Sequence, residues 1–385
     1  MRALAMFAAA TAYRVARTAL PLVLAAVLVV AISCGNQGAS GLGTGQTPLR
    51  DAGGEAARRP QVAEPLSLDR VRSWAYQLQD LTAPGALDAL AASRYDLLVL
   101  EPTRTDWSSD ERAFDTHGMV ERLQASAAHD GRHRKLVVAY VDIGQAEDWR
   151  WYWTWSHNWN CRRSPPDDWP AYILACDPDG WGGDYPVAYW EDAWKQVMIY
   201  GVEGGASDRD YLSALDEVLR DGFDGIYLDW VEGYEDEAVV EAAEEAGRDP
   251  AAEMVSFMRE IHDYARARHP GFLVIQQNAP SLVEGHPEVL EVIDAVAQEA
   301  VWYDGEAADD WNDGDGHDRG QAPDLSAFYL SSLARYQKAG LPVLNCEYAV
   351  DHAEEAYRRS LEHGLVPYVT RTPLSRLSTT PPPGY

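Results

Sequence analysis

The chain has 385 residues, a formal net charge of −29 at pH 7 and 46% hydrophobic residues, which is enough apolar material for one large domain or two average ones. The excess of acidic side chains argues against nucleic-acid binding, because phosphate groups are bound by Lys and Arg. We therefore expect no nucleic-acid partner.

Residues 1–33 have the pattern of a signal peptide. Three arginines precede an apolar run over residues 19–32, which is shorter than the roughly 20 residues of a membrane-spanning helix. The run ends in Ala-Ile-Ser-Cys-Gly, which is similar to the lipobox of bacterial lipoproteins and predicts lipidation of Cys34. An uncleaved anchor and an ordinary secretory signal are the alternatives. All three predict an extracytoplasmic protein, either anchored in the membrane or secreted.

The remaining chain divides into a linker and one domain. Residues 34–66 are rich in Gly, Ala, Ser, Gln and Arg, which predicts a flexible tether. The folded domain is expected over residues 67–380. Cys161 and Cys176 flank a Pro-rich stretch and are expected to form a disulfide in an oxidising compartment, with two unpaired thiols as the alternative. Cys346 is expected to be a buried thiol.

From residue 70 onward, short apolar runs alternate with amphipathic stretches. The runs are rich in β-branched and aromatic residues, as in buried parallel strands. The eight predicted strands are residues 73–78, 96–100, 136–143, 197–200, 225–230, 272–276, 295–301 and 342–346. The predicted helices are residues 208–220, with Ser207 as N-cap, and residues 249–269, 326–339 and 351–363. This alternation predicts a single α/β domain with the (β/α)8 fold of a TIM barrel, and an open doubly wound sheet is the alternative.

Polar and acidic residues follow most of the predicted strands. The carboxyl ends of barrel strands form the active face, so residues there are candidates for catalysis. Alternation along the strands places Asp229, Glu299 and Glu347 on the inward face, near the barrel mouth. Glycosidic bond cleavage typically uses two carboxyl groups, one as proton donor and one as nucleophile or base.

The sequence predicts neither a metal nor an organic cofactor. The acidic residues 309–318 offer oxygen atoms that suit calcium, but they lack the spacing of an EF-hand, and we expect a solvated loop. The ten histidines form no His-Glu-x-x-His motif, so zinc catalysis is not expected.

Two sequence blocks resemble a known enzyme family. Residues 140–153, Tyr-Val-Asp-Ile-Gly-Gln-Ala-Glu-Asp-Trp-Arg-Trp-Tyr-Trp, resemble the block Y-x-x-x-G-x-x-E-x-x-R-x-Y-W of glycoside hydrolase family 114, the endo-α-1,4-polygalactosaminidases and their bacterial and archaeal relatives. Residues 222–229, Gly-Phe-Asp-Gly-Ile-Tyr-Leu-Asp, match a second block, and the resemblance extends over residues 73–370. The chain departs from the family pattern directly after both expected catalytic residues, at 230–232 and 300–303, which bears on the substrate.

The resemblance implies a barrel that hydrolyses an amino-sugar polysaccharide such as polygalactosamine. It places the catalytic aspartate at Asp229 and the catalytic glutamate at Glu299. The residues expected to contact or position the substrate are Tyr76, Asp142, Glu147, Arg150, Tyr227, Asn278, Trp302, Glu347 and Tyr348. For Glu147 and Arg150 a buried ion pair is the alternative, and for Glu347 and Tyr348 it is packing at the barrel mouth.

The sequence thus leaves two main hypotheses, with an envelope structural or scaffold protein as a third. The first is an extracytoplasmic glycoside hydrolase that acts on a polysaccharide. The second is a non-catalytic, carbohydrate-binding envelope lipoprotein on a barrel scaffold. Nine tryptophans within residues 149–194 are compatible with both, since indole rings stack on sugars, and packing beneath a long loop is the alternative.

Overall fold

The computed structural model describes residues 63–378, apart from 104, 106–112, 158, 160, 162–164 and 203–211. The predicted signal peptide, Cys34, most of the tether and the predicted N-cap Ser207 therefore lie outside the described residues. Within the described part of the chain, no helix combines the length and hydropathy needed to span a membrane.

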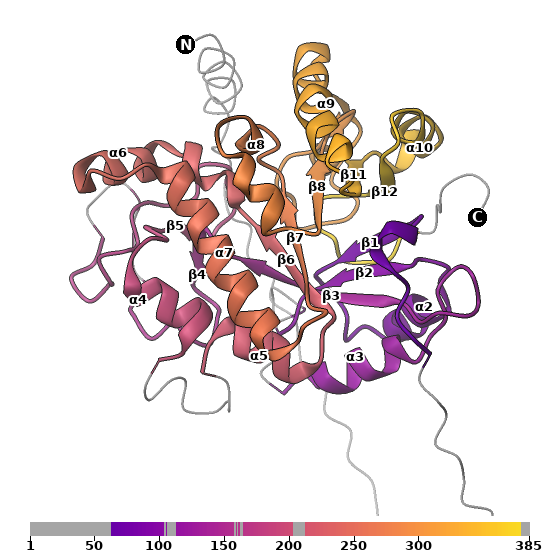
Figure 1. Cartoon of the computed structure of the whole chain (residues 1–385), viewed down its shortest axis with the longest axis horizontal. Coiled ribbons are helices and arrows are strands. Elements are labelled where there is room, and N and C mark those ends of the chain that lie inside the picture. Colours follow the sequence, from indigo (N-terminus) through magenta and orange to yellow (C-terminus); the bar gives the residue numbers. More distant parts are fainter. Residues whose placement is uncertain are drawn as a thin grey trace, which may run out of the picture. The chain divides into compact units, whose positions relative to one another are not determined.

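Eight parallel strands form a barrel (Figure 1), in the order β1-β2-β3-β6-β7-β8-β11-β12. Their bounds are β1 Trp74–Gln77, β2 Leu97–Leu100, β3 Leu136–Asp142, β6 Gly225–Asp229, β7 Leu273–Gln277, β8 Ala295–Glu299, β11 Val343–Tyr348 and β12 Val366–Thr370. The indole Nε1 of Trp74 donates to the carbonyl of Val366 at 2.9 Å and so links the first strand to the last. The predicted (β/α)8 fold is confirmed, as a nearly closed TIM-like barrel.

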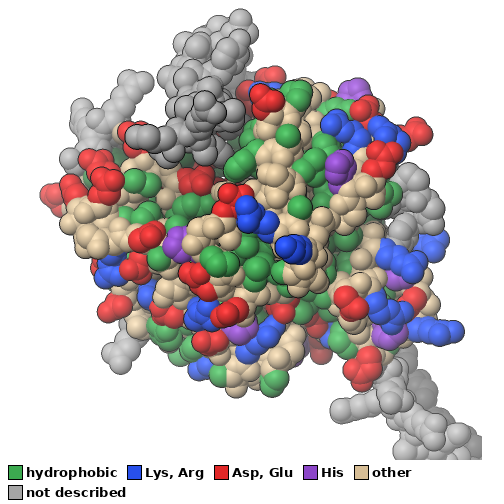
Figure 2. Space-filling view, turned by 45° about the horizontal axis from the view of Figure 1, so that its top comes forward, with side chains coloured by type: hydrophobic (Ala, Val, Ile, Leu, Met, Phe, Trp, Pro, Cys, Tyr) green, Lys and Arg blue, Asp and Glu red, His purple; other side chains and the backbone are tan. Residues whose placement is uncertain are grey.

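Helices surround the strands (Figure 1). The longer ones are α2 Ala86–Ala92, α3 Thr116–Gln124, α5 Ala214–Asp221, α6 Glu237–Ala246, α7 Pro250–Arg268, α9 Pro323–Lys338 and α10 Ala353–Glu362. Shorter elements are η1 Leu68–Arg70, α4 Asp192–Lys195, η3 Val231–Glu235, α8 Leu282–Gly285, η4 Pro287–Glu291, η5 Gly314–Gly316 and η6 Val350–His352. Asp249 caps α7 through backbone N–H groups of its first turn, with Pro250 at the first helical position. On the face shown in Figure 2, acidic and basic side chains are interspersed with apolar ones.

One predicted strand is wrong. Residues 197–200 belong to η2, a π-helical turn over Gln196–Tyr200 that continues α4. Its apolar side chains are buried, and a short buried apolar run has the same composition in a strand as in a helix. The eighth barrel strand is β12 instead. Helix α5 begins only at Ala214, where the Ser213 hydroxyl accepts a hydrogen bond from the N–H of Asp216.

Aromatic side chains fill the barrel beneath its carboxyl-terminal end. The ring centroid of Tyr227 lies 5.3 Å from that of Tyr76 and 6.1 Å from that of Trp74, and Trp74 lies 5.9 Å from Tyr368. All four side chains are buried. Tyr227 is thus on the inward face of β6, which strand alternation also assigns to Asp229.

A long loop between β3 and α4 is held by a short ribbon and a disulfide. The strands β4 Gln145–Glu147 and β5 Asp184–Pro186 pair antiparallel at its base. Cys161 and Cys176 form the expected disulfide, with a Cα–Cα distance of 5.8 Å, and Cys346 is a buried free thiol.

Removal of this disulfide is expected to lower stability. The bond closes a loop of 15 residues, for which the chain-entropy model predicts about 3 kcal/mol. We expect the Cys161→Ala/Cys176→Ala variant to lose up to that amount in the free energy of unfolding, measured by urea denaturation without reductant. Reductant should destabilise the wild type but not the variant, and equal stability of the two proteins would contradict the prediction.

Candidate active site

Three neighbouring strands end in the same way and bring three polar side chains together. Asp229 and Glu299 are the last residues of β6 and β8, and Asn278 follows β7 between them. The backbone then turns into the left-handed region, at Trp230 with φ 56°, at Asn278 with φ 54° and at Ala300 with φ 53°. Non-glycine residues adopt this conformation at a cost that surrounding structure must offset, and such positions cluster at functional sites.

Close packing fixes the turn after β6. A Cβ atom at Gly144 would lie 2.5 Å from the carbonyl oxygen of Trp230 and 2.7 Å from its ring. Only glycine therefore lets the segment after β3 approach the residue that follows Asp229.

Asp229 is partly exposed and accepts two hydrogen bonds. The N–H of Trp230 donates to Oδ1 at 2.7 Å, and the hydroxyl of Tyr140 donates to Oδ2. Burial, followed by the negative charge of Glu299, raises the pKa of Asp229 to about 7, against the lowering effect of these two hydrogen bonds. The protonated form of Asp229 is therefore more favoured than that of a free aspartic acid.

Glu299 is also partly exposed. The hydroxyl of Tyr348 donates to its Oε1 at 2.8 Å, and Nδ2 of Asn278 donates to Oε2 at 3.4 Å. Burial raises the pKa of Glu299, while these two bonds lower it. Two interacting carboxyl groups with raised pKa values can supply one proton donor and one carboxylate near neutral pH.

A third carboxyl group, Glu232, joins this network. Nδ2 of Asn278 donates to its Oε1 at 3.0 Å, while Oδ1 of Asn278 accepts from the N–H of Glu299 at 3.1 Å. Burial and the charge of Asp229 raise the pKa of Glu232 well above its usual value. Sequence reasoning treated Glu232 only as a departure from the family pattern, because its place depends on the η3 turn.

Three residues expected to contact the substrate are instead buried beneath the site. Arg150 lies between Glu101 and Glu147, with N–O distances of 2.6 Å to each, and so forms the buried ion pair considered as the alternative. Asp142 accepts from the N–H groups of Gly144 and Gln145, at 2.9 and 2.8 Å. All of these acidic and basic side chains are buried, so they shape the loop after β3 rather than facing solvent.

Two further expectations are corrected by burial. Glu347 is fully buried, and its carboxylate accepts from the backbone N–H groups of Val301, Trp302 and Tyr303, at 2.7–3.2 Å. Trp302 points toward α10, where its Nε1 donates to Ser360 at 2.9 Å. These residues therefore fix the segment after Glu299 and do not line a sugar site.

The tyrosines and tryptophans also divide by position. Tyr76 and Tyr227 form the buried floor described above, whereas Tyr348 reaches Glu299 directly. In the long loop, the rings of Trp153, Trp159 and Tyr185 lie 4.8–5.1 Å from that of Trp169. These tryptophans therefore pack against one another, which is the alternative considered from the sequence.

Two cavities bear on possible ligand positions. A void of about 10 Å³, whose lining includes Asp142, Glu147 and Arg150, has room for about one water molecule. The larger hollow, lined by residues of α3 and the α2 region, lies away from the carboxyl pair. Among the described residues, the group with metal-ligand spacing is His317, Asp318 and Asp351.

Comparison with known proteins identifies related sequences over nearly the whole chain. The model of glycoside-hydrolase family GH114 matches residues 55–382. An uncharacterized protein of Deinococcus radiodurans is 30% identical over 354 residues, covering 89% of this chain and 93% of that protein. An uncharacterized protein of Methanocaldococcus jannaschii is 29% identical over 316 residues, covering 78% of this chain and 75% of that protein.

Two solved structures share the fold. The glycoside hydrolase domain of PelA from Pseudomonas aeruginosa has a TM-score of 0.52 and 16% identity, covering 79% of this chain and 96% of that domain. Aspergillus fumigatus Ega3, solved as a complex with galactosamine, has a TM-score of 0.52 and 15% identity, covering 84% of this chain and 99% of Ega3.

Proposed function

Since the chain belongs to glycoside-hydrolase family GH114, we propose that it hydrolyses a polysaccharide with Asp229 as nucleophile or base and Glu299 as proton donor. The observation that carries this proposal is the position of the two carboxyl groups. They end β6 and β8 on either side of β7, both are partly exposed, and burial raises the pKa of both groups.

The surroundings of each carboxyl group support this division of roles. Asp229 accepts from two donors that the fold fixes, the N–H of Trp230 and the hydroxyl of Tyr140, which orient a carboxylate for attack. Burial raises the pKa of Glu299, as a proton donor to the leaving oxygen requires, but it raises the pKa of Asp229 as well, so the division of roles rests on the hydrogen-bond donors around each group. Asn278 bonds to both the backbone and the side chain of Glu299 and so orients it.

We propose an amino-sugar polymer, such as polygalactosamine, as the substrate. Several carboxyl groups lie at or beneath the barrel mouth and interact electrostatically with Asp229, namely Asp142, Glu147, Asp184, Glu232 and Glu299. A bound ammonium group would favour the ionised forms of these carboxyl groups, whose pKa values burial raises, and so favours a sugar that carries one. The galactosamine bound by Ega3 agrees with this substrate class.

We also propose that the protein acts outside the cytoplasm, held to a membrane through lipidated Cys34. The support is the signal-like pattern of residues 1–33 together with the Cys161–Cys176 disulfide, since disulfides persist in oxidising compartments.

A substrate screen tests the proposed activity. The wild type is incubated with α-1,4-polygalactosamine, its N-acetylated form, chitosan and a neutral glucan, and reducing-end release is measured. The Asp229→Asn/Glu299→Gln variant, purified in the same way, measures release by contaminating enzymes. We expect release from the amino-sugar polymer that the double variant lacks. Binding without release from any polymer would instead favour the carbohydrate-binding lipoprotein.

Replacement of Tyr348 by Phe is expected to change the pH dependence of hydrolysis. The hydroxyl of Tyr348 lowers the pKa of Glu299, so its removal raises that pKa. A proton donor works in its protonated form, so the fall in kcat at high pH should move to higher pH. Loss of one charged hydrogen bond should also lower kcat about tenfold. The measurement is a pH–rate profile, and an unmoved alkaline limb would contradict the assignment of that limb to Glu299.

A further inference from the structure

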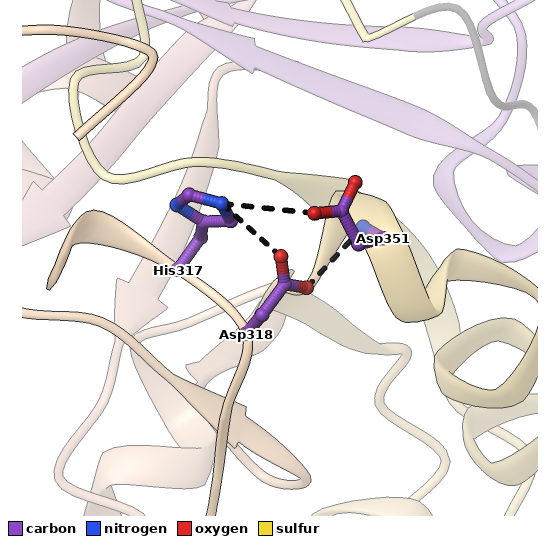
Figure 3. A group of neighbouring side chains, drawn as sticks. All are labelled: His317, Asp318 and Asp351. Atoms are coloured by element: carbon purple, nitrogen blue, oxygen red, sulfur yellow. Dashed lines mark hydrogen bonds and ion pairs between the residues drawn. The ribbon is translucent and has the colours of Figure 1, made fainter. Parts of the chain in front are cut away.

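His317, Asp318 and Asp351 form a group of potential ligands outside the proposed catalytic pair (Figure 3). His317 and Asp318 lie between η5 and β10 (Arg319–Gly320), and Asp351 lies in η6, directly after β11. Nε2 of His317 is 3.2 Å from Oδ2 of Asp318 and 3.9 Å from Oδ2 of Asp351. One ligand atom from each residue falls within 4.8 Å of the others.

The imidazole is held so that Nε2 faces the two carboxylates. The side chain of His317 is only 10% exposed, and its Nδ1 lies 2.9 Å from the carbonyl oxygen of Asp313. A carbonyl oxygen can only accept a hydrogen bond, so Nδ1 carries a proton and donates it. In the neutral imidazole, the lone pair of Nε2 then points toward Asp318 and Asp351, as in metal-binding histidines whose other nitrogen is held by the protein.

Each carboxylate has one oxygen held by the protein and the other directed at the histidine. Oδ1 of Asp318 accepts from the N–H of Asp351 at 3.2 Å, while its buried Oδ2 faces Nε2 of His317 at 3.2 Å. Oδ1 of Asp351 faces Arg371 at 3.5 Å, while its Oδ2 faces His317. Three electron-pair donors therefore face one point, where either a bound cation or a proton on Nε2 balances the charge of the two carboxylates.

We propose that His317, Asp318 and Asp351 bind one divalent transition-metal ion, with Zn²⁺ as the representative. Ligand atoms about 2.0–2.2 Å from zinc in a tetrahedron lie roughly 3.4 Å apart, which matches the spacing between His317 and Asp318. An imidazole favours zinc and its neighbours over calcium or magnesium, and two carboxylates neutralise the charge of the ion. The site departs from the expectation, made from the sequence, that the protein binds no metal.

The ion would tie two segments together next to Tyr348. The N–H of Asp318 donates to the carbonyl of Tyr348 at 2.6 Å, and the hydroxyl of Tyr348 donates to Glu299. Metal binding would thus fix the segment before β10 to the end of β11. This structural role is independent of the proposed hydrolysis.

Calorimetric titration of the chelator-treated, full-length protein with Zn²⁺ tests the site. We expect one equivalent to bind, and His317→Ala and Asp351→Asn each to weaken binding at least about tenfold. Asp351 is largely exposed, so its replacement leaves the fold intact even where His317→Ala does not. The control is Asp315→Asn, which removes the same charge as Asp351→Asn from η5, two residues before His317, and should bind as the wild type does. Zn²⁺ should raise Tm in the wild type and the control only.

Two results would overturn the proposal. Absence of saturable Zn²⁺ binding would show that a proton on His317 alone balances the charge of the two carboxylates. Equal weakening by Asp315→Asn and His317→Ala would show diffuse attraction of cations to an acidic loop. Neither result bears on the proposed hydrolysis, which is measured on Asp229 and Glu299.

Discussion

Replacement of Glu299 by Gln should lower hydrolysis of the polysaccharide by about 10²–10⁴-fold, the usual contribution of a positioned acid. Gln has nearly the same shape and can still accept the hydrogen bond from Tyr348, but it cannot donate a proton to the leaving oxygen. An aryl glycoside with an acidic phenol leaves without protonation, so the variant should hydrolyse that substrate with a much smaller loss. The measurement is the ratio between the loss of activity on the polysaccharide and the loss on the aryl glycoside.

The pH dependence of hydrolysis provides a second test of the Glu299→Gln variant. Wild-type activity should fall at high pH as Glu299 loses its proton, at a pH above the ordinary glutamate range because burial raises its pKa. The Gln variant should lack this fall. An equal loss on both substrates would assign Glu299 to the attacking role, and an unchanged rate on the polysaccharide would exclude it from the chemistry.

Replacement of Arg150 by Met should cost about 3–5 kcal/mol in the free energy of unfolding, because it leaves two buried carboxylates without a counter-charge. The guanidinium is 7% exposed and bonds to Glu101 at 2.6 and 3.1 Å and to Glu147 at 2.6 and 3.2 Å. Urea denaturation measures the loss. The triple variant Glu101→Gln/Arg150→Met/Glu147→Gln should recover part of it, since the unpaired charges are gone.

Arg358→Met is the matched control. Arg358 pairs with Glu362 on the exposed face of α10, and such solvent-exposed pairs contribute little to stability. The deficit of Arg150→Met should also depend on pH. Arg150 lowers the pKa of Glu147, which burial raises to about 7, so its removal raises that pKa further. Because this folded-state pKa lies above the unfolded value, the deficit should be smaller near pH 5 and grow as the pH rises. A deficit no larger than that of the control would contradict the buried triad.

The sequence predicted the barrel because most strands carry a strong local signal. Residues 225–229 alternate inward and outward side chains, and the end of that strand places Asp229 at the mouth. The run at 197–200 has similar composition but lies in a π-helical turn, because its buried face is covered by neighbouring helices rather than by paired strands. Strand β12 was not predicted, because Pro367 interrupts the run of residues that is typical of a strand.

The sequence predicts the position of a site residue where that residue ends a strand. It does not predict the position where the path of a loop determines it. Asp229 and Glu299 end strands, so their place follows from the fold. Glu347 also ends its strand pattern on the inward face, yet the segment after Glu299 folds over it and donates three N–H groups. Glu232 carries no signal of its own, because it reaches Asn278 only through the left-handed turn at Trp230.

The central claim is that Asp229 acts as nucleophile or base on the bond that Glu299 protonates, and Asp229→Asn tests it most directly. The control is Asp236→Asn, seven residues further along, where the amide oxygen can still cap α6. We expect reducing-end release from the amino-sugar polymer to fall at least about 10³-fold in Asp229→Asn, with a wild-type unfolding transition, and to stay unchanged in the control. Release by Asp229→Asn at the wild-type rate would contradict the account.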